Sequence, residues 1–289
     1  LETKGLIFMS KKKLSKQQLQ RISQKQQAYA DKDMLQGLVI TRGKSQVLVE
    51  SFNDKQEIVC KIRADIDSLV VGDIVYWQQE SITEGVIVAV CPRKTALGRY
   101  DRYHQYKVLA ANISQMIVVI APKPEPSTLL LDSYLVAAAC IGVKLSIVFN
   151  KTDLDDETEP LEHYFRDLYQ DLCEHFTNSQ KHPNLKGLAE ILESEQSVFV
   201  GQSGVGKSSI INLILPQKQL ATLPLNAIHE LGQHTTSSAT LYHLPYGGAI
   251  IDSPGVRAFS LSHLKQSDLL WGFAEFRPFI GRCKFRDCD

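Results

Sequence analysis

The sequence predicts a multidomain protein of α/β plus β class, in which a small β-barrel precedes a larger α/β domain and a short C-terminal module. Three observations support this fold class. Short β-rich runs crowd residues 37–90, buried strands alternate with helices from Ser114 onward, and two cysteines follow a helical segment near Asp289. A chain of 289 residues has room for two or more domains, since a domain usually takes about 100–200 residues.

The first 34 residues are expected to form a basic tail. Met9 and the residues after it look like a natural start, so residues 1–8 are expected to be non-native or upstream sequence. Residues 9–30 contain bases and no acid, although the whole chain balances 32 bases against 32 acids. Such a tail either contacts a polyanion or is a solvated disordered segment, and the charge pattern does not separate the two.

Residues 35–98 are expected to form a barrel. The β-rich runs cover 37–40, 46–50, 57–62, 73–77 and 86–90, and turn signals separate them. Five short strands fit an OB-type fold best, with an SH3-like barrel as the alternative. The basic connector at 92–107 follows, and its interleaved tyrosines either stack on nucleic-acid bases or pack on neighbouring protein.

A mostly parallel sheet covered by helices is predicted for residues 99–263. Continuous apolar runs at 116–120, 145–149, 197–200 and 249–251 indicate buried strands, and helices are predicted at 129–141, 160–193 and 207–215. Ligands bind beyond the carboxyl ends of such strands. The polar segments after the last three runs are therefore candidate binding loops.

One candidate loop, from Gly201 to Ser208, has the G-x4-G-K-S spacing of a phosphate-binding loop. It lies between a predicted strand and a predicted helix, as that motif requires. Its backbone N–H groups would hold phosphate oxygens, Lys207 would bridge the β- and γ-phosphates, and Ser208 would bind Mg²⁺. A chance match is expected in only roughly 1% of chains of this length. The predicted contact residues are Gly201, Gln202, Ser203, Gly204, Val205, Gly206, Lys207, Ser208 and Ser209.

The second candidate loop is Asn150-Lys151-Thr152-Asp153. The Asp153 carboxylate can accept hydrogen bonds from N1–H and the exocyclic amine of guanine, a pairing that adenine does not offer. The stem of Lys151 can lie along the base, and Asn150 can brace neighbouring loops. An ordinary polar turn is the alternative, and a phosphate loop on the same sheet argues against it.

The third candidate loop begins at Asp252 and ends at Gly255. Asp252 would hold Mg²⁺ through water, and the Gly255 N–H would sense the γ-phosphate. Upstream, Gly232-Gln233-His234-Thr235-Thr236 offers Thr235 or Thr236 as a further Mg²⁺ ligand in a switch segment, and the sequence does not choose between them. A DxxG motif is weak by itself, and its value here comes from its position after a strand.

The order of the three loops is unusual. A conventional GTPase presents the phosphate loop, then DxxG, then NKxD, whereas here NKxD comes first. Domain termini often lie close together, so joining them and opening the chain elsewhere preserves the spatial neighbours. The sequence therefore predicts a circularly permuted P-loop GTPase domain.

These motifs resemble those of the ribosome small-subunit-dependent GTPase A family, the YjeQ/RsgA type, along nearly the whole chain. The resemblance rests on the segments 12–16, 37–90, 111–115, 150–153, 201–209, 232–236, 252–256 and 276–288. It implies GTP or GDP and Mg²⁺ as cofactors. It also implies GTP hydrolysis stimulated by the small (30S) ribosomal subunit, contact with its 16S rRNA, and a role late in subunit maturation.

The resemblance further implies a C-terminal helical zinc-binding module at 264–289. Cys283 and Cys288 match the first half of the family's Cys-x4-Cys-x-His-x5-Cys pattern, so both are expected zinc ligands, with the remaining ligands beyond Asp289. Two thiolates cannot complete a tetrahedral structural site. Members of the family usually carry a further guanine-specificity segment after NKxD, rich in serine and followed by Gly-Leu. Here an apparent insertion separates 176–179 from Gly187, so no residue is assigned to that segment.

Val256 follows DxxG where many GTPases place a water-orienting glutamine. An aliphatic side chain cannot orient water, so we expect slow intrinsic hydrolysis. We hypothesise that His234 supplies the catalytic polar group together with Lys207, a solvated loop histidine being the alternative. An rRNA-binding module that uses GTP only as a regulatory ligand is the competing function, and an ATP-using P-loop kinase disagrees with NKxD and DxxG.

The chain carries six cysteines and no apparent secretory signal, which indicates reduced thiols. We expect a cytoplasmic monomer without membrane association.

Overall fold

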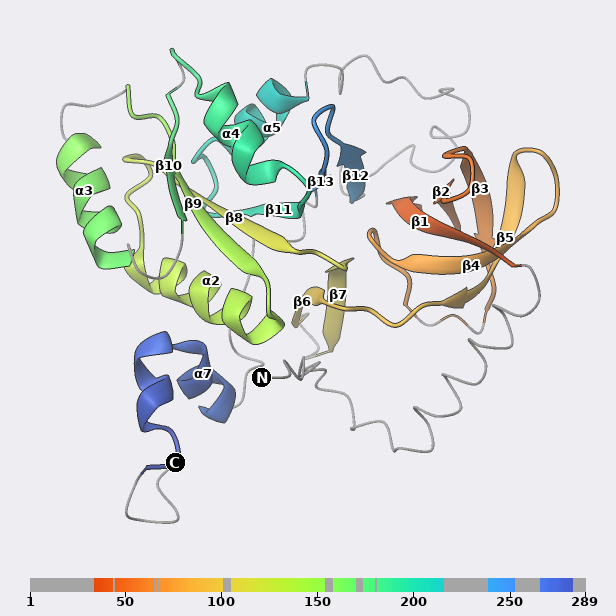
Figure 1. The fold of residues 1–289 in the computed structure, drawn as a ribbon, viewed down its shortest axis with the longest axis horizontal. Helices are drawn as coiled ribbons and strands as arrows, with labels where there is room; N and C mark the ends of the chain where they lie inside the picture. The colour runs from red at the N-terminus through yellow and green to blue at the C-terminus, as the bar shows by residue number, and fades with distance from the viewer. Residues whose placement is uncertain are drawn as a thin grey trace.

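An 11-stranded sheet joins a barrel to an α/β domain (Figure 1). The computed structural model describes residues 34–43, 45–64, 66, 68–100, 105–153, 158–169, 174–179, 181–215, 239–252 and 266–282. The strand order is β10-β9-β8-β11-β13-β12-β1-β2-β3-β5-β4. Within the described ranges, no helix is both long enough and apolar enough to span a lipid bilayer.

The barrel contains the five predicted strands. They are β1 (Leu35–Arg42), β2 (Gln46–Ser51), β3 (Glu57–Ile62), β4 (Ile74–Gln79) and β5 (Glu84–Val90). A pairing of β1 with β4 closes the order β1-β2-β3-β5-β4 into a ring, in which β3 and β5 are parallel. This closed arrangement of five strands fits the OB type. Buried Val39, Val75 and Trp77 fill its interior.

Five parallel strands form the core of the α/β domain. They are β8 (Gln115–Ile120), β9 (Lys144–Phe149), β10 (Glu174–Thr177), β11 (Gln196–Val200) and β13 (Ala249–Asp252), while β12 (Thr240–His243) runs antiparallel to β13. Side chains alternate between the faces of a strand, and on β8 Met116 and Val118 join one buried cluster while Ile117 and Val119 join another.

Helices cover both faces of this sheet, as the continuous apolar strands predict. On one face lie α2 (Thr128–Ile141) and α3 (Thr158–Tyr169), and on the other lie α4 (Leu185–Leu192) and α5 (Lys207–Ile214) (Figure 1). The α2 helix begins where the Ser127 hydroxyl accepts a hydrogen bond from the Leu130 N–H. It ends at Gly142, whose φ of 78° favours glycine.

Three segments differ from the sequence expectations. The segment 160–193, predicted to be helical, contains β10 between α3 and α4, because pairing with β9 lets Phe176 pack on the sheet core. The connector at 92–107 contributes to a two-stranded ribbon, β6 (Ala96–Tyr100) and β7 (Tyr106–Ala111). Strand β12 was not predicted, since its four residues are too short to show a period.

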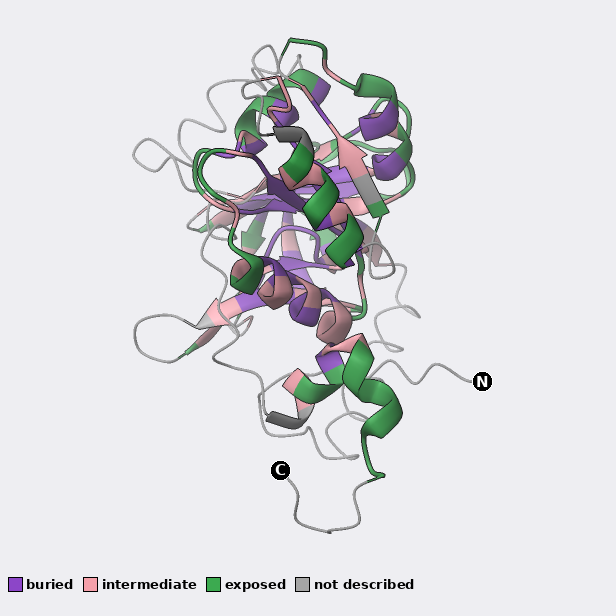
Figure 2. Cartoon of the chain, turned by 90° about the vertical axis from the view of Figure 1, so that its left-hand side faces the viewer, coloured by how far each residue is buried: buried purple, intermediate pink, exposed green. Residues whose placement is uncertain are grey.

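The C-terminal module at 264–289 was expected to be helical. It forms α7 (Gln266–Gly272) followed by the 3₁₀-helix η3 (Ala274–Phe279). The α7 helix contacts α2, where the Cys140 Sγ lies 3.4 Å from the Asp268 carbonyl oxygen. Figure 2 shows that η3 is largely exposed and that α7 is mixed in its exposure, whereas buried residues concentrate in the sheet and on the helix faces toward it.

The barrel is fastened to the α/β domain at two places. Strand β1 pairs with β12 at Thr41 and Thr240, and near this pairing the His243 Nε2 lies 2.7 Å from the Glu50 Oε2. Farther away, the Asn112 Nδ2 donates to the Gly72 carbonyl at 2.8 Å. A Cβ at Gly72 would meet the Ala111 carbonyl oxygen at 2.1 Å, so only glycine allows this close approach.

A buried ion pair holds the turn that contains Gly72. The Asp73 side chain is fully buried, and Arg93 donates to both of its carboxylate oxygens, from Nε at 2.6 Å and from Nη2 at 2.8 Å. The Val70 N–H also donates to Asp73, at 2.8 Å. The pair therefore has the two-bond geometry and the additional hydrogen bond that a buried charge requires.

We expect Asp73→Ala to destabilise the protein by about 3–5 kcal/mol, because it leaves the Arg93 guanidinium buried without its partner. The measurement is urea denaturation of each variant. Lys61→Ala is the control, since Lys61 and Glu80 form an ion pair whose side chains are 58% and 46% exposed. Its loss is expected to change stability by no more than about 1 kcal/mol. Similar small losses in both variants would contradict a structural role for the Asp73 pair.

Candidate nucleotide-binding site

The predicted binding loops meet at one edge of the sheet. Residues 150–153 follow β9, residues 201–206 follow β11, and Asp252 is the last residue of β13. These strands are parallel, and β8 lies between β9 and β11. Their carboxyl ends therefore point in the same direction, and the loops that follow them converge.

The loop 201–206 has a backbone conformation that residues other than glycine would adopt only with strain. Gly201, Gly204 and Gly206 have φ values of 131°, 86° and 100°. A Cβ at Gly201 would lie 2.3 Å from the Val119 carbonyl oxygen, so the loop runs directly against β8. Gly206 is the N-cap of α5 and makes no side-chain cap hydrogen bond. The start of α5, which no side chain caps at Gly206, is therefore a suitable binding place for an anion.

Lys207 lies folded over this loop. Its side chain is buried, and the Nζ donates to the Gly201 carbonyl at 2.8 Å and to the Gln202 carbonyl. Ser208 and Ser209 are exposed on the first turn of α5. A buried ammonium held by neutral carbonyls would bind an anion more strongly than it binds those carbonyls, because opposite charges attract strongly where water is excluded.

The loop 150–153 is attached to the loop 201–206 by two side chains. The Asn150 side chain is 1% exposed, and its Nδ2 donates to the Val205 carbonyl at 2.9 Å. The Lys151 Nζ donates to the Gly204 carbonyl at 2.6 Å and to the Lys123 carbonyl at 3.3 Å. The two loops therefore form one unit, as the bracing role of Asn150 anticipated.

Asn178 joins the loop 150–153 to the end of β10 and was not assigned from the sequence. It is buried directly after β10, and its Nδ2 donates to the Asn150 Oδ1 at 2.7 Å. Its carbonyl accepts hydrogen bonds from the Thr152 N–H at 3.4 Å and the Thr152 hydroxyl at 3.3 Å. The sequence carried no usable signal for it, because the strand that places Asn178 beside Asn150 lies in a segment predicted to be helical.

The apparent insertion after Asn178 is closed at its base. The Asn184 N–H donates to the Asn178 Oδ1 at 3.1 Å, and the Asn184 side chain caps α4 by accepting from the Gly187 N–H at 2.9 Å. The residues between the two asparagines thus form a loop whose ends are joined. A chain of side-chain amides runs from the start of α4 through Asn178 and Asn150 to the carbonyl of Val205.

Asp153 and Asp252 are partly exposed at the same edge of the sheet, where a ligand can reach them. With the exposed Ser208 hydroxyl, the Asp252 carboxylate offers the oxygen donors that Mg²⁺ prefers, so these residues fit the predicted ion. Other predicted site residues lie outside the described ranges: His234, Thr235, Thr236, Gly255, Cys283 and Cys288. Among the described residues, no group of three or more His, Cys, Asp or Glu side chains is arranged to hold a metal.

We expect Gly206→Ala to weaken GDP binding at least tenfold. A Cβ at Gly206 would lie 2.3 Å from the Asn150 Nδ2, so it would break the bond between the two loops in addition to straining the backbone. Gly142→Ala is the matched control, because Gly142 also has a positive φ, of 78°, but nothing lies within 4 Å of its Cβ position. The control should lose about 1–2 kcal/mol of stability and keep its GDP affinity. Equal affinities in a fluorescent-GDP titration would contradict the proposed packing.

Comparison with protein families supports the GTPase resemblance that the motifs indicate. The family model described as RsgA GTPase matches residues 90–262. The small ribosomal subunit biogenesis GTPase RsgA of Hahella chejuensis is 42% identical over 97% of this chain and 87% of its own length, and that of Alcanivorax borkumensis has the same identity and coverage.

Two solved structures have the same fold. YjeQ from Thermotoga maritima superimposes with a TM-score of 0.70 at 29% identity, over 88% of each chain. YloQ, described as a circularly permuted GTPase, gives a TM-score of 0.65 at 26% identity, over 88% of this chain and 83% of its own. The family model covers more than half of the sequence, and the relatives match nearly all of it. This chain therefore belongs to the RsgA family of circularly permuted GTPases.

Proposed function

We propose that this protein binds GTP across the loops 150–153 and 201–208 and hydrolyses it to GDP and phosphate during biogenesis of the small ribosomal subunit. The observation that carries the proposal is the hydrogen bond from the Asn150 Nδ2 to the Val205 carbonyl, which fastens a guanine-recognition loop to a phosphate loop. The names of the RsgA relatives supply the biological setting.

Each residue of the site has a proposed role. Asp153 accepts from N1–H and the amine of guanine, and the stem of Lys151 lies along the base. The loop 201–206 and the first turn of α5 donate N–H groups to the phosphates, and Lys207 neutralises charge on the β- and γ-phosphates. Ser208, Asp252 and one of Thr235 or Thr236 would hold Mg²⁺, which supplies further charge neutralisation at the phosphates.

The remaining assignments are also proposals. We assign a basic tail to residues 1–34, the barrel to 35–98, the GTPase domain to 99–263 and a zinc-binding module to 264–289. In that module Cys283 and Cys288 supply two of the zinc ligands. We propose 16S rRNA as a contact of the protein on the small subunit, and a cytoplasmic monomer as its working form.

The direct test is GTP hydrolysis by the purified chain with and without small ribosomal subunits. We expect slow turnover alone, because Val256 cannot orient water, and a large increase when the subunits are added. Competition between GDP and ADP for the same site should favour GDP strongly, since Asp153 has no matching donors on adenine. Equal binding of ADP would contradict the guanine site, and no turnover in either condition would favour a regulatory GTP-binding role instead.

We expect His234→Ala to abolish the subunit-stimulated turnover while leaving GTP affinity unchanged. The histidine is proposed to orient or activate the attacking water, a role that general acid–base groups typically support with about 10²–10⁴-fold in rate. Single-turnover hydrolysis with excess small subunits measures the effect, and fluorescent-nucleotide binding is the control. Unchanged stimulated turnover would remove His234 from the mechanism.

A further inference from the structure

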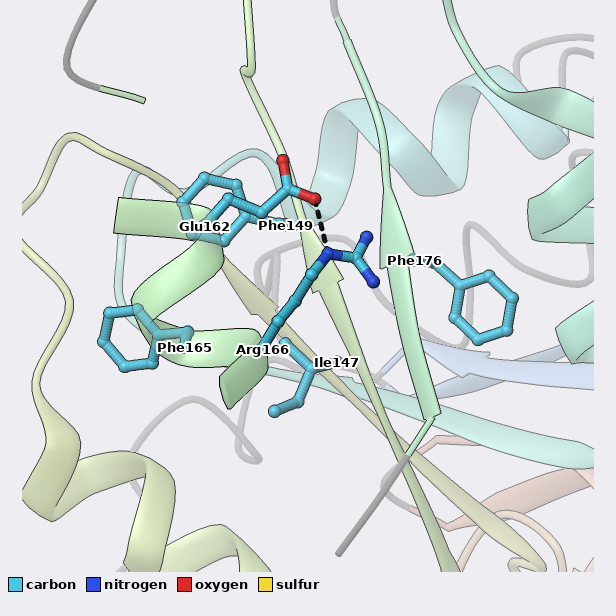
Figure 3. Close-up of a pocket in the computed structure, with 6 residues that line it drawn as sticks. All are labelled: Ile147, Phe149, Glu162, Phe165, Arg166 and Phe176. Carbon is cyan, nitrogen blue, oxygen red and sulfur yellow. Dashed lines mark hydrogen bonds and ion pairs between the residues drawn. The ribbon is translucent and has the colours of Figure 1, made fainter. Parts of the chain in front are cut away.

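A closed polar cluster joins α3 to the end of β10. Figure 3 shows two of its members, Glu162 and Arg166. Arg166 donates from Nε to the Glu162 Oε1 at 2.7 Å and from Nη2 to the Thr177 hydroxyl at 2.7 Å. The Thr177 hydroxyl in turn donates to the same Glu162 oxygen at 2.7 Å. Three side chains thus satisfy one another, two from a helix and one from the last residue of β10.

The cluster lies among apolar side chains. Figure 3 shows Glu162 and Arg166 at a small pocket between α3 and strands β9 and β10, which Ile147, Phe149 and Phe165 also line. The ring of Phe176 lies on the other side of β10. The Arg166 and Glu162 side chains are 37% and 17% exposed. Their interaction is therefore screened less by water than that of an ion pair on an open helix surface.

Another ion pair in the same domain shows the contrast. Lys186 and Glu190 on α4 have the same four-residue spacing, but they lie 3.8 Å apart with side chains 89% and 63% exposed. This ion pair joins two residues of one helix and includes no residue of a strand. The α4 pair supports its own helix at most, whereas the α3 cluster fixes the end of a strand.

Thr177 is the last residue of β10, so its placement also sets the placement of Asn178, the next residue. In the sheet Thr177 is the register partner of Phe149, the last residue of β9. The next residues of the two strands are Asn178 and Asn150, joined by the 2.7 Å bond between their side chains. The Asn178 N–H also donates to the Phe149 carbonyl at 2.8 Å. A shift of the β10 end would therefore move the partner of Asn150.

We propose that Glu162, Arg166 and Thr177 are positioning residues for nucleobase recognition. They hold the end of β10 so that Asn178 keeps Asn150 in place, and with it the loop that ends at Asp153. None of the three belongs to the proposed nucleotide contacts, and the inference rests on the proposed guanine site. The α3 helix thereby becomes part of the specificity apparatus of the GTPase domain.

The inference concerns discrimination between purine bases more than overall affinity. Asp153 is proposed to accept two hydrogen bonds from guanine, whereas hypoxanthine lacks the exocyclic amine and can donate only one. Hydrogen bonding of this kind depends on the placement of the carboxylate. A loosened loop should therefore reduce the preference for GDP over IDP, while phosphate contacts, common to both ligands, affect the two equally.

The test is competitive binding of GDP, IDP and ADP to the full chain, with thermal melting of every variant. Thr177→Val removes the hydroxyl and keeps the shape of the side chain, and we expect the GDP-to-IDP affinity ratio to fall about three- to tenfold, the loss of roughly one hydrogen bond. Thr177→Ser keeps the hydroxyl and should stay within about twofold of the original ratio. Arg166→Ala should match Thr177→Val, and the double variant should show little further change.

Lys186→Ala is the control, and its ratio should not change. An unchanged ratio in Thr177→Val, or an equal change in Lys186→Ala, would overturn the inference. Where Thr177→Val does not fold, Glu162→Leu, which removes the oxygen that accepts from both Arg166 and Thr177, takes its place with the same expectation. An unaltered chain that binds ADP as well as GDP would remove the proposed guanine site itself, a result distinct from failure of the variants alone.

Discussion

The buried side chain of Asn150 is the contact on which the rest of the site depends. An asparagine side chain carries an acceptor and two donors, and here Nδ2 donates to the Val205 carbonyl while Oδ1 accepts from Asn178. The side chain is 1% exposed, so a lost partner would leave a buried polar atom unsatisfied. One residue thereby fixes the spacing between the loop 150–153, proposed to select the base, and the loop 201–206, proposed to hold the phosphates.

The sheet explains how this side chain comes to stand between two loops distant in sequence. Strands β9, β8 and β11 are parallel neighbours, so the segments that follow β9 and β11 emerge at one edge although about fifty residues separate them. Permutation of the chain leaves this adjacency unchanged. What it alters is the connection: the barrel now precedes β8 and β9 along the chain, and β13 precedes the C-terminal helices.

The barrel is joined to the α/β domain near Asp252. Thr41 of β1 pairs with Thr240 of β12, and Thr240 is the register partner of Asp252. The proposed Mg²⁺-facing aspartate and the barrel therefore share one line of residues across three strands. Backbone pairing thus connects the end of β13, where Asp252 lies, to the first strand of the barrel.

Much of this architecture could be predicted from the sequence, and the remainder could not for physical reasons. Continuous apolar runs located β8, β9, β11 and β13, and glycine spacing located the phosphate loop. Strands β10 and β12 have four residues each, like β13, but polar residues at both ends leave them without a continuous apolar run. They are held by pairing with neighbouring strands. Asn178 was missed for the same reason, since its role depends on a strand partner.

The account is tested most directly by a crystal structure of the chain with GDP and Mg²⁺. It predicts the base edge against Asp153, the phosphates within residues 201–208, and the hydrogen bonds from Asn178 to Asn150 and from Asn150 to Val205 both intact. Nucleotide bound elsewhere, or bound at these loops with the Asn150 bond to Val205 broken, would contradict it.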